Sequence, residues 1–513
     1  MVAPRTRPVG DIADFYAAIW SAVRETVERW HLAIFVEVAM VAGWFAIRTV
    51  AGADGRTYFF WVIAAGVLAL VSPLSALVVL IATSAFFEPD SIARVIAPRE
   101  LVVIPLAIGV LIRVVLDRFR WRPEPALWIA LLLLAGTAVG VWTAFMRFDQ
   151  EIAWHAARSW LGNAAAPVIL LIAAAWTARG GRIRALVVAC AVGVVVALVC
   201  LLEYFVPGSV SLGPFEWVGF WKDFGNRLDG TIPSPNALSA QLIVPTMMLL
   251  AAALLAKDLR LRVIAALASV PMLAANYFTF SRSPLLALYV FVVVAAWRIR
   301  RRFGIAALAV GLVVGAALLP SYLAIRSQAS GVETIPGSVL VATDQLRLRG
   351  WEAATRMFLD QPLTGQGYLA YHELADAFGD PELGSPHNEW LRFFAEDGVV
   401  VGLLGIAFIV MTTRSLYRVP GWLGTGLTSG FLGYVLAASF NNPLLFLRVS
   451  AVAFPIVGVG LALAERRRSV VRARAEAVTA APESEAETTA VQPAPEPAPE
   501  PSGPGDTDQP ALD

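Results

Sequence analysis

The sequence predicts an all-α protein that crosses a membrane many times. Its 513 residues are 58% hydrophobic and 15% charged, with a mean hydropathy of +0.67, whereas soluble domains are nearer half apolar and a quarter charged. The apolar residues fall in runs of about 15–25, which is long enough to cross a bilayer. Because lipid offers no hydrogen bonds to the backbone, such runs must be helices, and the body of the protein is a helical bundle.

Fourteen apolar runs are candidate spans, and a total of twelve or thirteen also fits the pattern. The stretch 59–87 is the ambiguous one, since Pro73 either separates two short spans or kinks one long helix. The candidates are residues 32–50, 59–72, 73–87, 101–116, 126–146, 160–177, 183–206, 237–256, 262–280, 284–299, 304–323, 398–413, 421–439 and 445–464.

Arginine-rich segments between the spans predict the orientation. Cytoplasmic loops of membrane proteins carry an excess of Lys and Arg. All the clustered segments fall on one side if the N-terminus is cytoplasmic and the number of spans is even, which favours two spans in 59–87. The clusters lie at residues 118–122, 179–184, 257–262, 298–302, 414–418 and 466–468.

Four regions follow from this topology. Residues 1–31 include apolar side chains at helical spacing and predict an amphipathic helix on the cytoplasmic membrane surface. Residues 32–464 form the transmembrane domain. Within it, residues 324–397 form a long extracytoplasmic loop, and a loop of that length usually has a function. Residues 465–513 are rich in Ala, Pro and Glu and predict a disordered cytoplasmic tail.

Arginines on the extracytoplasmic side are the first candidates for a site. Arg282 lies in the sequence SRS close to the boundary of an apolar run, where a charge is costly and marks a functional site unless it only snorkels to headgroups. Arg347 and Arg349 lie in the long loop and are either solvated or functional. A guanidinium suits phosphate groups because its planar fork binds oxyanions through two hydrogen bonds.

A histidine at the mouth of a span is the second candidate. His387 begins the sequence HNEW in the long loop and is either structural or a general base that removes a proton from a hydroxyl. The sequence shows no Walker A loop, no zinc-ligand spacing and no nucleophile elbow. It therefore predicts chemistry without a metal or a cofactor.

The order of four motifs resembles the O-antigen ligase and polymerase family. They are SRS at 281–283, R-L-x-x-W at 347–351, P-L-x-G-x-G at 362–367, and HNEWL followed by EDG at 387–398. The resemblance extends over roughly residues 220–460. It implies a multi-pass glycosyltransferase of the bacterial cytoplasmic membrane that uses an undecaprenyl-diphosphate-linked glycan as donor. The acceptor is then a hydroxyl of a glycan, lipid or protein, and no nucleic acid is involved.

The resemblance also implies roles for individual residues. Arg282 and Arg347 grip the donor diphosphate, and His387 activates the acceptor hydroxyl. Further residues at matching or neighbouring positions have a supporting role. These are Arg227, Asn236, Arg349, Asn388 and Glu396.

Several alternatives stay open at the level of the sequence. A transporter or flippase of lipid-linked saccharides is the alternative function, although the chain shows no internal repeat of the kind that many transporters carry. The motifs do not distinguish a ligase from a polymerase. Nor do they identify the sugar, the acceptor or the oligomeric state.

Overall fold

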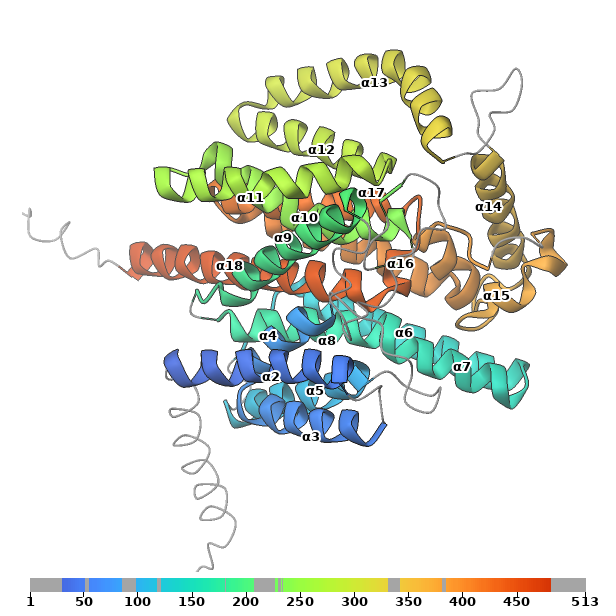
Figure 1. Ribbon diagram of the computed structural model, residues 1–513, viewed down its shortest axis with the longest axis horizontal. Coiled ribbons are helices and arrows are strands. Elements are labelled where there is room, and N and C mark those ends of the chain that lie inside the picture. The colour runs from blue at the N-terminus through green and yellow to red at the C-terminus, as the bar shows by residue number, and fades with distance from the viewer. Residues whose placement is uncertain are drawn as a thin grey trace, which may run out of the picture. The chain divides into compact units, whose positions relative to one another are not determined.

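The computed structural model describes most of the chain as helices joined by short segments (Figure 1). The described residues are 30–50, 55–84, 98–117, 121–179, 181–206, 227–228, 232, 234–330, 342–380 and 384–480. The predicted amphipathic helix lies outside these ranges, and so does the tail beyond residue 480. The chain divides into two units, residues 1–467 and 468–513. In the second unit the structure describes the end of one helix, which carries an exposed ion pair between Arg472 and Glu476.

Wherever the structure describes them, the fourteen predicted spans lie on helices. By length and composition, eight helices there are long and apolar enough to cross a membrane, and four shorter apolar helices accompany them. The protein is therefore a multi-pass helical bundle. The helices that carry the predicted spans are α2 (Trp30–Val50), α3 (Gly55–Val71), α4 (Pro73–Ser84), α5 (Pro98–Leu116), α6 (Pro125–Arg147), α8 (Ala166–Thr177), α9 (Arg184–Phe205), α10 (Pro235–Leu255), α11 (Leu259–Phe278), α12 (Arg282–Ile299), α13 (Arg301–Ser330), α16 (Glu389–Arg418), α17 (Gly421–Ala438) and α18 (Leu447–Ala480).

Further short elements connect the spans. Ser72 alone separates α3 from α4, because Pro73 has no N–H with which to continue the helical ladder. The long loop contains the helix α14, and α16 begins nine residues before the predicted span. The additional elements are α7 (Gln150–Trp160), η1 (Leu161–Ala165), α14 (Ala342–Asp360), α15 (Ala370–Leu374), η2 (Asp376–Phe378) and η3 (Pro443–Leu445).

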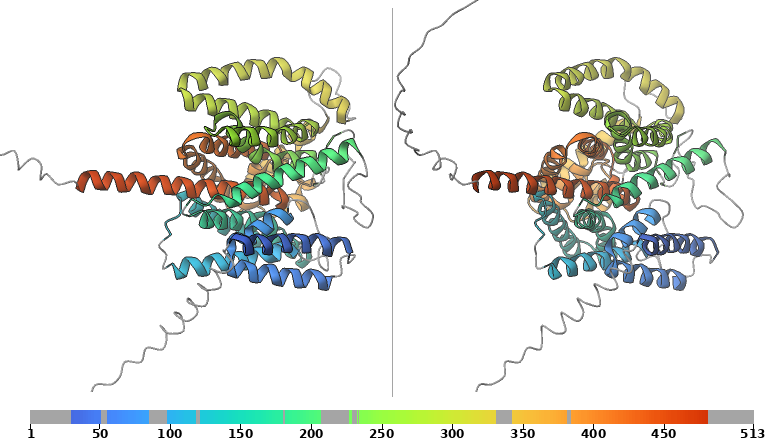
Figure 2. Two further views of the ribbon diagram at one scale, coloured as in Figure 1. Left: turned by 60° about the vertical axis from the view of Figure 1, so that its left-hand side comes forward. Right: turned by 90° about the vertical axis from the view of Figure 1, so that its left-hand side faces the viewer.

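Two helices form the centre of the first unit. The apolar part of α18 is 94% buried and that of α10 is 72% buried, whereas α6, α11 and α12 are buried over less than a third of theirs. Figures 1 and 2 show α18 passing between the N-terminal helices on one side and α10 to α13 on the other. The outer helices therefore present apolar side chains outward, as expected of a bundle whose solvent is lipid.

Arginines from separate segments meet at one end of the bundle. Arg298, near the end of α12, donates hydrogen bonds to the carbonyl oxygens of Val419 (2.9 Å) and Tyr417 (2.7 Å) at the end of α16. Arg467 in turn donates to the carbonyl oxygen of Arg418. These contacts place three of the predicted arginine clusters on a common side, which is the condition that the positive-inside rule requires.

A kink in α16 is held by the P-L-x-G-x-G motif. Gly398 has φ 82° and ψ −178°, so the helix is broken there and neighbouring backbone groups lose their helical partners. The motif supplies replacements: the N–H of Gly367 donates to the carbonyl of Glu396 (2.8 Å), and the N–H of Val399 donates to the carbonyl of Pro362 (2.8 Å). The motif is thus a backbone brace for the segment that leads into the span.

Replacing Gly365 by alanine is expected to destabilise this brace. The residue has φ 67°, and a Cβ there would overlap the carbonyl oxygen of Glu396. The left-handed conformation alone costs a non-glycine residue about 1–3 kcal/mol. Thermal unfolding of the purified protein in detergent should show a lower midpoint than the wild type. The control is Gly43→Ala in α2, where a Cβ meets nothing within 4 Å; equal midpoints for both variants would contradict the assignment.

Candidate active site

Arg282 is the first residue of α12 and is half-buried. α11 ends at Phe278, and the turn that follows has Phe280 in a left-handed conformation, with φ 46°. The N–H of Ser281 bonds to the hydroxyl of Thr279 at 3.2 Å, which closes the turn. Arg282 therefore lies at the positive end of a helix, where backbone N–H groups add to the attraction for an anion.

Arg227 and Asn236 brace this turn. The Nη2 atom of Arg227 donates to Oδ1 of Asn236 at 3.2 Å, and its Nε donates to the carbonyl oxygen of Thr279 at 2.9 Å. The N–H of Leu228 bonds to the carbonyl of Phe278 at 2.9 Å. The guanidinium of Arg227 therefore positions the turn before Arg282, and Asn236, on α10, orients this guanidinium.

His387 lies at the entrance to α16 in an unusual backbone conformation. Its φ is 49°, in the left-handed region that favours glycine. The conformation is stabilised from the next residue, because Oδ1 of Asn388 accepts hydrogen bonds from the N–H groups of Trp390 and Leu391, both at 3.1 Å. Asn388 thus caps α16, and the cap fixes the direction in which the imidazole leaves the backbone.

Three side chains interact with the imidazole of His387. Burial and the neighbouring guanidinium of Arg347 lower the pKa of His387, and the Asn441 amide and the Asp380 carboxylate partly oppose this shift. The net pKa lies below the usual value of 6.5, so the neutral form dominates at pH 7. The Nδ1 atom is buried and has no hydrogen-bond partner among the described residues. It is therefore the nitrogen that is able to accept a proton.

Arg347 reaches this cluster from α14. Trp351 follows it by four residues, so both side chains lie on one face of the helix, and the Trp351 ring lies 6.2 Å from that of Phe440. Arg349 is two residues from Arg347, which puts it on a different face, and it is exposed. The structure thus brings Arg347 to His387 and leaves Arg349 at the surface of the loop.

Glu396 lies within a buried ionic cluster. Arg392 donates to Glu396 at 3.2 Å and to Glu389 through both Nε and Nη2, and all three residues are at most 2% exposed. Oε1 of Glu396 also accepts from the N–H of Tyr371 at 3.3 Å. Glu396 therefore joins α16 to the segment that carries α15, and its carboxylate is occupied by these partners.

The two halves of the site lie at the same end of the bundle. α12 packs on α17, where Gly433 faces the side chain of Ala287, and α17 ends about one turn later at Ala438. Arg282 lies five residues before Ala287 on α12, just as Ala438 lies five residues after Gly433 on α17, so Arg282 is level with the end of α17. Just beyond α17, the hydroxyl of Ser439 accepts a hydrogen bond from Nε1 of Trp390 at 3.0 Å. Arg282 and the segment that carries His387 therefore both lie near the end of α17.

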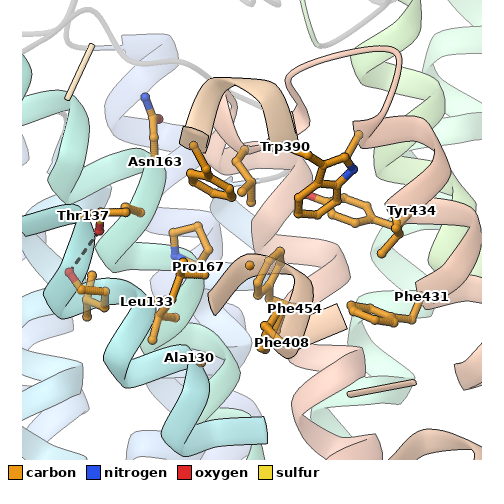
Figure 3. A pocket seen from close by; sticks show the side chains of 18 residues that line it. Ala130, Leu133, Thr137, Asn163, Pro167, Trp390, Phe408, Phe431, Tyr434 and Phe454 are labelled. Atoms are coloured by element: carbon orange, nitrogen blue, oxygen red, sulfur yellow. Dashed lines mark hydrogen bonds between the residues drawn. The ribbon is translucent and has the colours of Figure 1, made fainter. Parts of the chain in front are cut away.

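An apolar cavity and an apolar groove adjoin these residues. The cavity, of about 50 Å³, lies between α6, η1, α8, α16, α17 and α18, and Trp390 and Tyr434 project toward it (Figure 3). The groove, of about 350 Å³, lies between α10, α11 and α12 and is lined mostly by apolar side chains, together with Thr246, Asn276 and Ser281. Arg282 follows Ser281 directly, so a cation stands at the end of an apolar groove.

Sequence reasoning assigned no role in the site to Asp380, Asn441 or Asn442. Asp380 is 2% exposed and accepts a hydrogen bond from the Tyr371 hydroxyl at 2.7 Å. Asn441 and Asn442 follow α17 and lie more than fifty residues from His387 in the chain. The pattern of polar and apolar residues along the chain does not predict contacts between segments that lie so far apart in the sequence. In the part of the chain that the structure describes, no group of three His, Cys, Asp or Glu side chains is arranged to hold a metal.

Replacing Asp380 by asparagine is expected to lower the pKa of His387 further. The carboxylate stabilises the imidazolium, and the amide keeps an oxygen for the Tyr371 hydroxyl while removing the charge. Titration of histidine-labelled protein by NMR, with His387 assigned from a His387→Ala sample, measures the change. Asp376→Asn, at an exposed position on η2, is the control. An unchanged or raised pKa in Asp380→Asn would show that the carboxylate does not act on the imidazole.

Comparison with known families gives a match over the segment that holds these residues. Residues 267–406 match the family model described as O-antigen ligase, and no curated protein matches the chain. The matched segment begins within α11 and ends within α16, so it contains Arg282, Arg347 and His387. Residues 267–406 are thus similar to O-antigen ligases, and the resemblance that the order of the motifs indicates is confirmed over this segment of the chain.

Proposed function

We propose that this protein is a membrane glycosyltransferase that transfers or polymerises a glycan from an undecaprenyl-diphosphate donor onto a hydroxyl acceptor, without a metal ion. The observation that carries the proposal is the pairing of His387 with Arg347 inside the segment that is similar to O-antigen ligases. A neutral, buried imidazole whose Nδ1 has no partner among the described residues is suited to be a general base. A guanidinium beside it is suited to stabilise an anionic leaving group.

The donor is proposed to lie with its diphosphate between Arg282 and Arg347. Both residues are arginines at one end of the bundle, and Arg282 also has the N-terminus of α12 behind it. The apolar groove that ends at Ser281 suits the prenyl chain, because it is lined almost entirely by carbon. Arg227 and Asn236 are proposed to hold the turn that aims Arg282, and Asn388 the turn that aims His387.

The proposed reaction is a single displacement. The acceptor oxygen attacks the anomeric carbon of the donor, and its proton passes to Nδ1 of His387. The bond between the anomeric carbon and the diphosphate oxygen breaks as the new glycosidic bond forms. The released prenyl diphosphate carries the negative charge and stays paired with Arg282 and Arg347. Attack opposite the leaving group inverts the configuration at the anomeric carbon.

The site is proposed to face the extracytoplasmic side of a bacterial cytoplasmic membrane. Arg298, Arg418 and Arg467 gather at one end of the bundle, and such clusters stay in the cytoplasm. Arg282 starts α12 and Arg298 stands near its end, so the two lie at opposite ends of that helix. The acceptor is then a glycan, lipid or protein that is exposed outside the cytoplasm, and both termini of the chain are cytoplasmic.

Deletion of the gene and analysis of the cell envelope test this function. The deletion strain should lose or shorten one envelope glycan and accumulate the corresponding prenyl-diphosphate-linked saccharide. The wild-type gene should restore the glycan, while His387→Ala should insert into the membrane at normal levels and restore nothing. Full restoration by His387→Ala, with a loss of transbilayer movement of the lipid-linked saccharide in the deletion strain, would instead identify a flippase.

A further inference from the structure

The segment between α17 and α18 is held against the site from two directions. Outside η3 it is irregular. The hydroxyl of Ser439 accepts a hydrogen bond from Trp390 at the start of α16, and the ring of Phe440 lies beside that of Trp351 on α14. Since α16 and α14 are the helices next to His387 and Arg347, the residues that follow Phe440 lie where the two candidate groups converge.

Those residues are two asparagines with unused hydrogen-bonding capacity. Asn442 is 2% exposed, and neither its Oδ1 nor its Nδ2 has a hydrogen-bond partner in the described part of the chain. Asn441 is 6% exposed, its Nδ2 likewise has no partner there, and its side chain lies beside the imidazole of His387. Three amide atoms and Nδ1 of His387 are therefore buried without hydrogen-bond partners among the residues that the structure describes.

Buried polar groups in native proteins are nearly always paired, and an unpaired amide is costly. A site that binds a polar ligand is one place where such groups are retained, because the ligand supplies the missing partners. The type of unpaired atom then identifies the ligand chemistry. Asn442 offers both a donor and an acceptor. A phosphate group has only acceptors to offer at neutral pH and would leave Oδ1 unpaired, whereas a sugar hydroxyl both donates and accepts.

We propose that Asn441 and Asn442 bind hydroxyl groups of the acceptor saccharide, next to the hydroxyl that His387 activates. The inference rests on the proposed function, which places the diphosphate on the arginines. The contact between Asn441 and His387 assigns the amide pair to the acceptor and not to the donor, because the group next to the base is the one that loses a proton. The two amides thus set which hydroxyl of the acceptor meets Nδ1.

The test compares acceptor binding with diphosphate binding in one variant. The donor is the lipid-linked saccharide that accumulates in the deletion strain, and the acceptor is the envelope glycan isolated from that strain. In Asn442→Leu, the KM for this glycan should rise about tenfold or more, as expected for the loss of hydrogen bonds to a buried polar group. The inhibition constant of inorganic diphosphate, which has no sugar hydroxyls, should stay within twofold of the wild type.

Two variants serve as controls. Asn442→Ser keeps one group that donates and accepts, so its KM for the glycan should rise less than that of Asn442→Leu, and it serves in place of the leucine variant if that variant does not fold. Asn163→Leu removes an amide from η1 at the wall of the apolar cavity and should change neither constant.

The outcomes distinguish a failure of this inference from a failure of the proposed function. Equal changes in the glycan KM and the diphosphate constant, a change in the diphosphate constant alone, or no change in either would overturn the assignment of the amide pair to the acceptor. A wild-type protein that transfers nothing from this donor to this glycan would overturn the proposed function itself.

Discussion

Replacement of His387 by alanine is expected to lower the rate of glycan transfer by about 10²–10⁴-fold, the usual contribution of a general base. The imidazole is neutral at pH 7 because burial and Arg347 lower its pKa, and its Nδ1 has no other partner in the described structure. Alanine leaves no group there to accept the proton of the acceptor hydroxyl. Initial rates of transfer with purified protein in detergent measure the loss.

His372→Ala is the matched control for this prediction. His372 belongs to the same loop but is exposed on α15, so its removal should leave the rate within twofold. Thermal unfolding of both variants separates a loss of chemistry from a loss of folding. Transfer by a folded His387→Ala protein at more than a tenth of the wild-type rate would rule out His387 as the base.

Removal of the Arg347 side chain is expected to have two effects that add to each other. Loss of a preorganised positive group next to a leaving anion typically costs about 10²–10³-fold in rate. Arg347 also lowers the pKa of His387. In Arg347→Ala the pKa of His387 should therefore rise. Because a protonated imidazole cannot act as the base, activity should be lost at a higher pH than in the wild type when the solution is acidified. A pH–rate profile measures both effects at once.

Arg347→Lys distinguishes charge from shape. Lysine keeps the positive charge, so the acid limb should stay near its wild-type position, but it lacks the planar fork that binds two phosphate oxygens, so the rate should recover only in part. Arg356→Ala removes an exposed arginine from the same helix. It should change neither the position of the acid limb nor the rate. An acid limb that does not move in Arg347→Ala would show that the guanidinium does not act on His387.

The membrane architecture was predictable because its signal is strong and local. Each apolar run must become a helix in lipid, and the structure has a helix at every predicted span. The position of Arg282 at the start of α12 follows equally from the end of an apolar run. The predicted partnership of Arg347 and His387 depended on the family motifs, since forty residues separate them and no periodicity connects a loop helix to a loop.

Other features of the site had no signal in the sequence. The left-handed backbone at His387 depends on the cap that Asn388 supplies, and the partners of Asp380, Asn441 and Glu396 come from distant segments. Glu396 and Asn388 were expected to support the reaction from within the site. Their observed hydrogen bonds fit structural roles: Glu396 balances Arg392, and Asn388 begins α16. From the local sequence alone, Glu396 would be interpreted as a solvated acidic residue.

Reconstitution in liposomes tests the central claim most directly. The purified protein is supplied with the prenyl-diphosphate-linked saccharide from the deletion strain and with the isolated envelope glycan, in the presence of EDTA and without nucleotide sugar. The wild-type protein should release one prenyl diphosphate for each saccharide unit that the glycan gains, whereas His387→Ala should neither release prenyl diphosphate nor extend the glycan. Movement of the lipid-linked saccharide between leaflets without any new glycosidic bond would contradict the account.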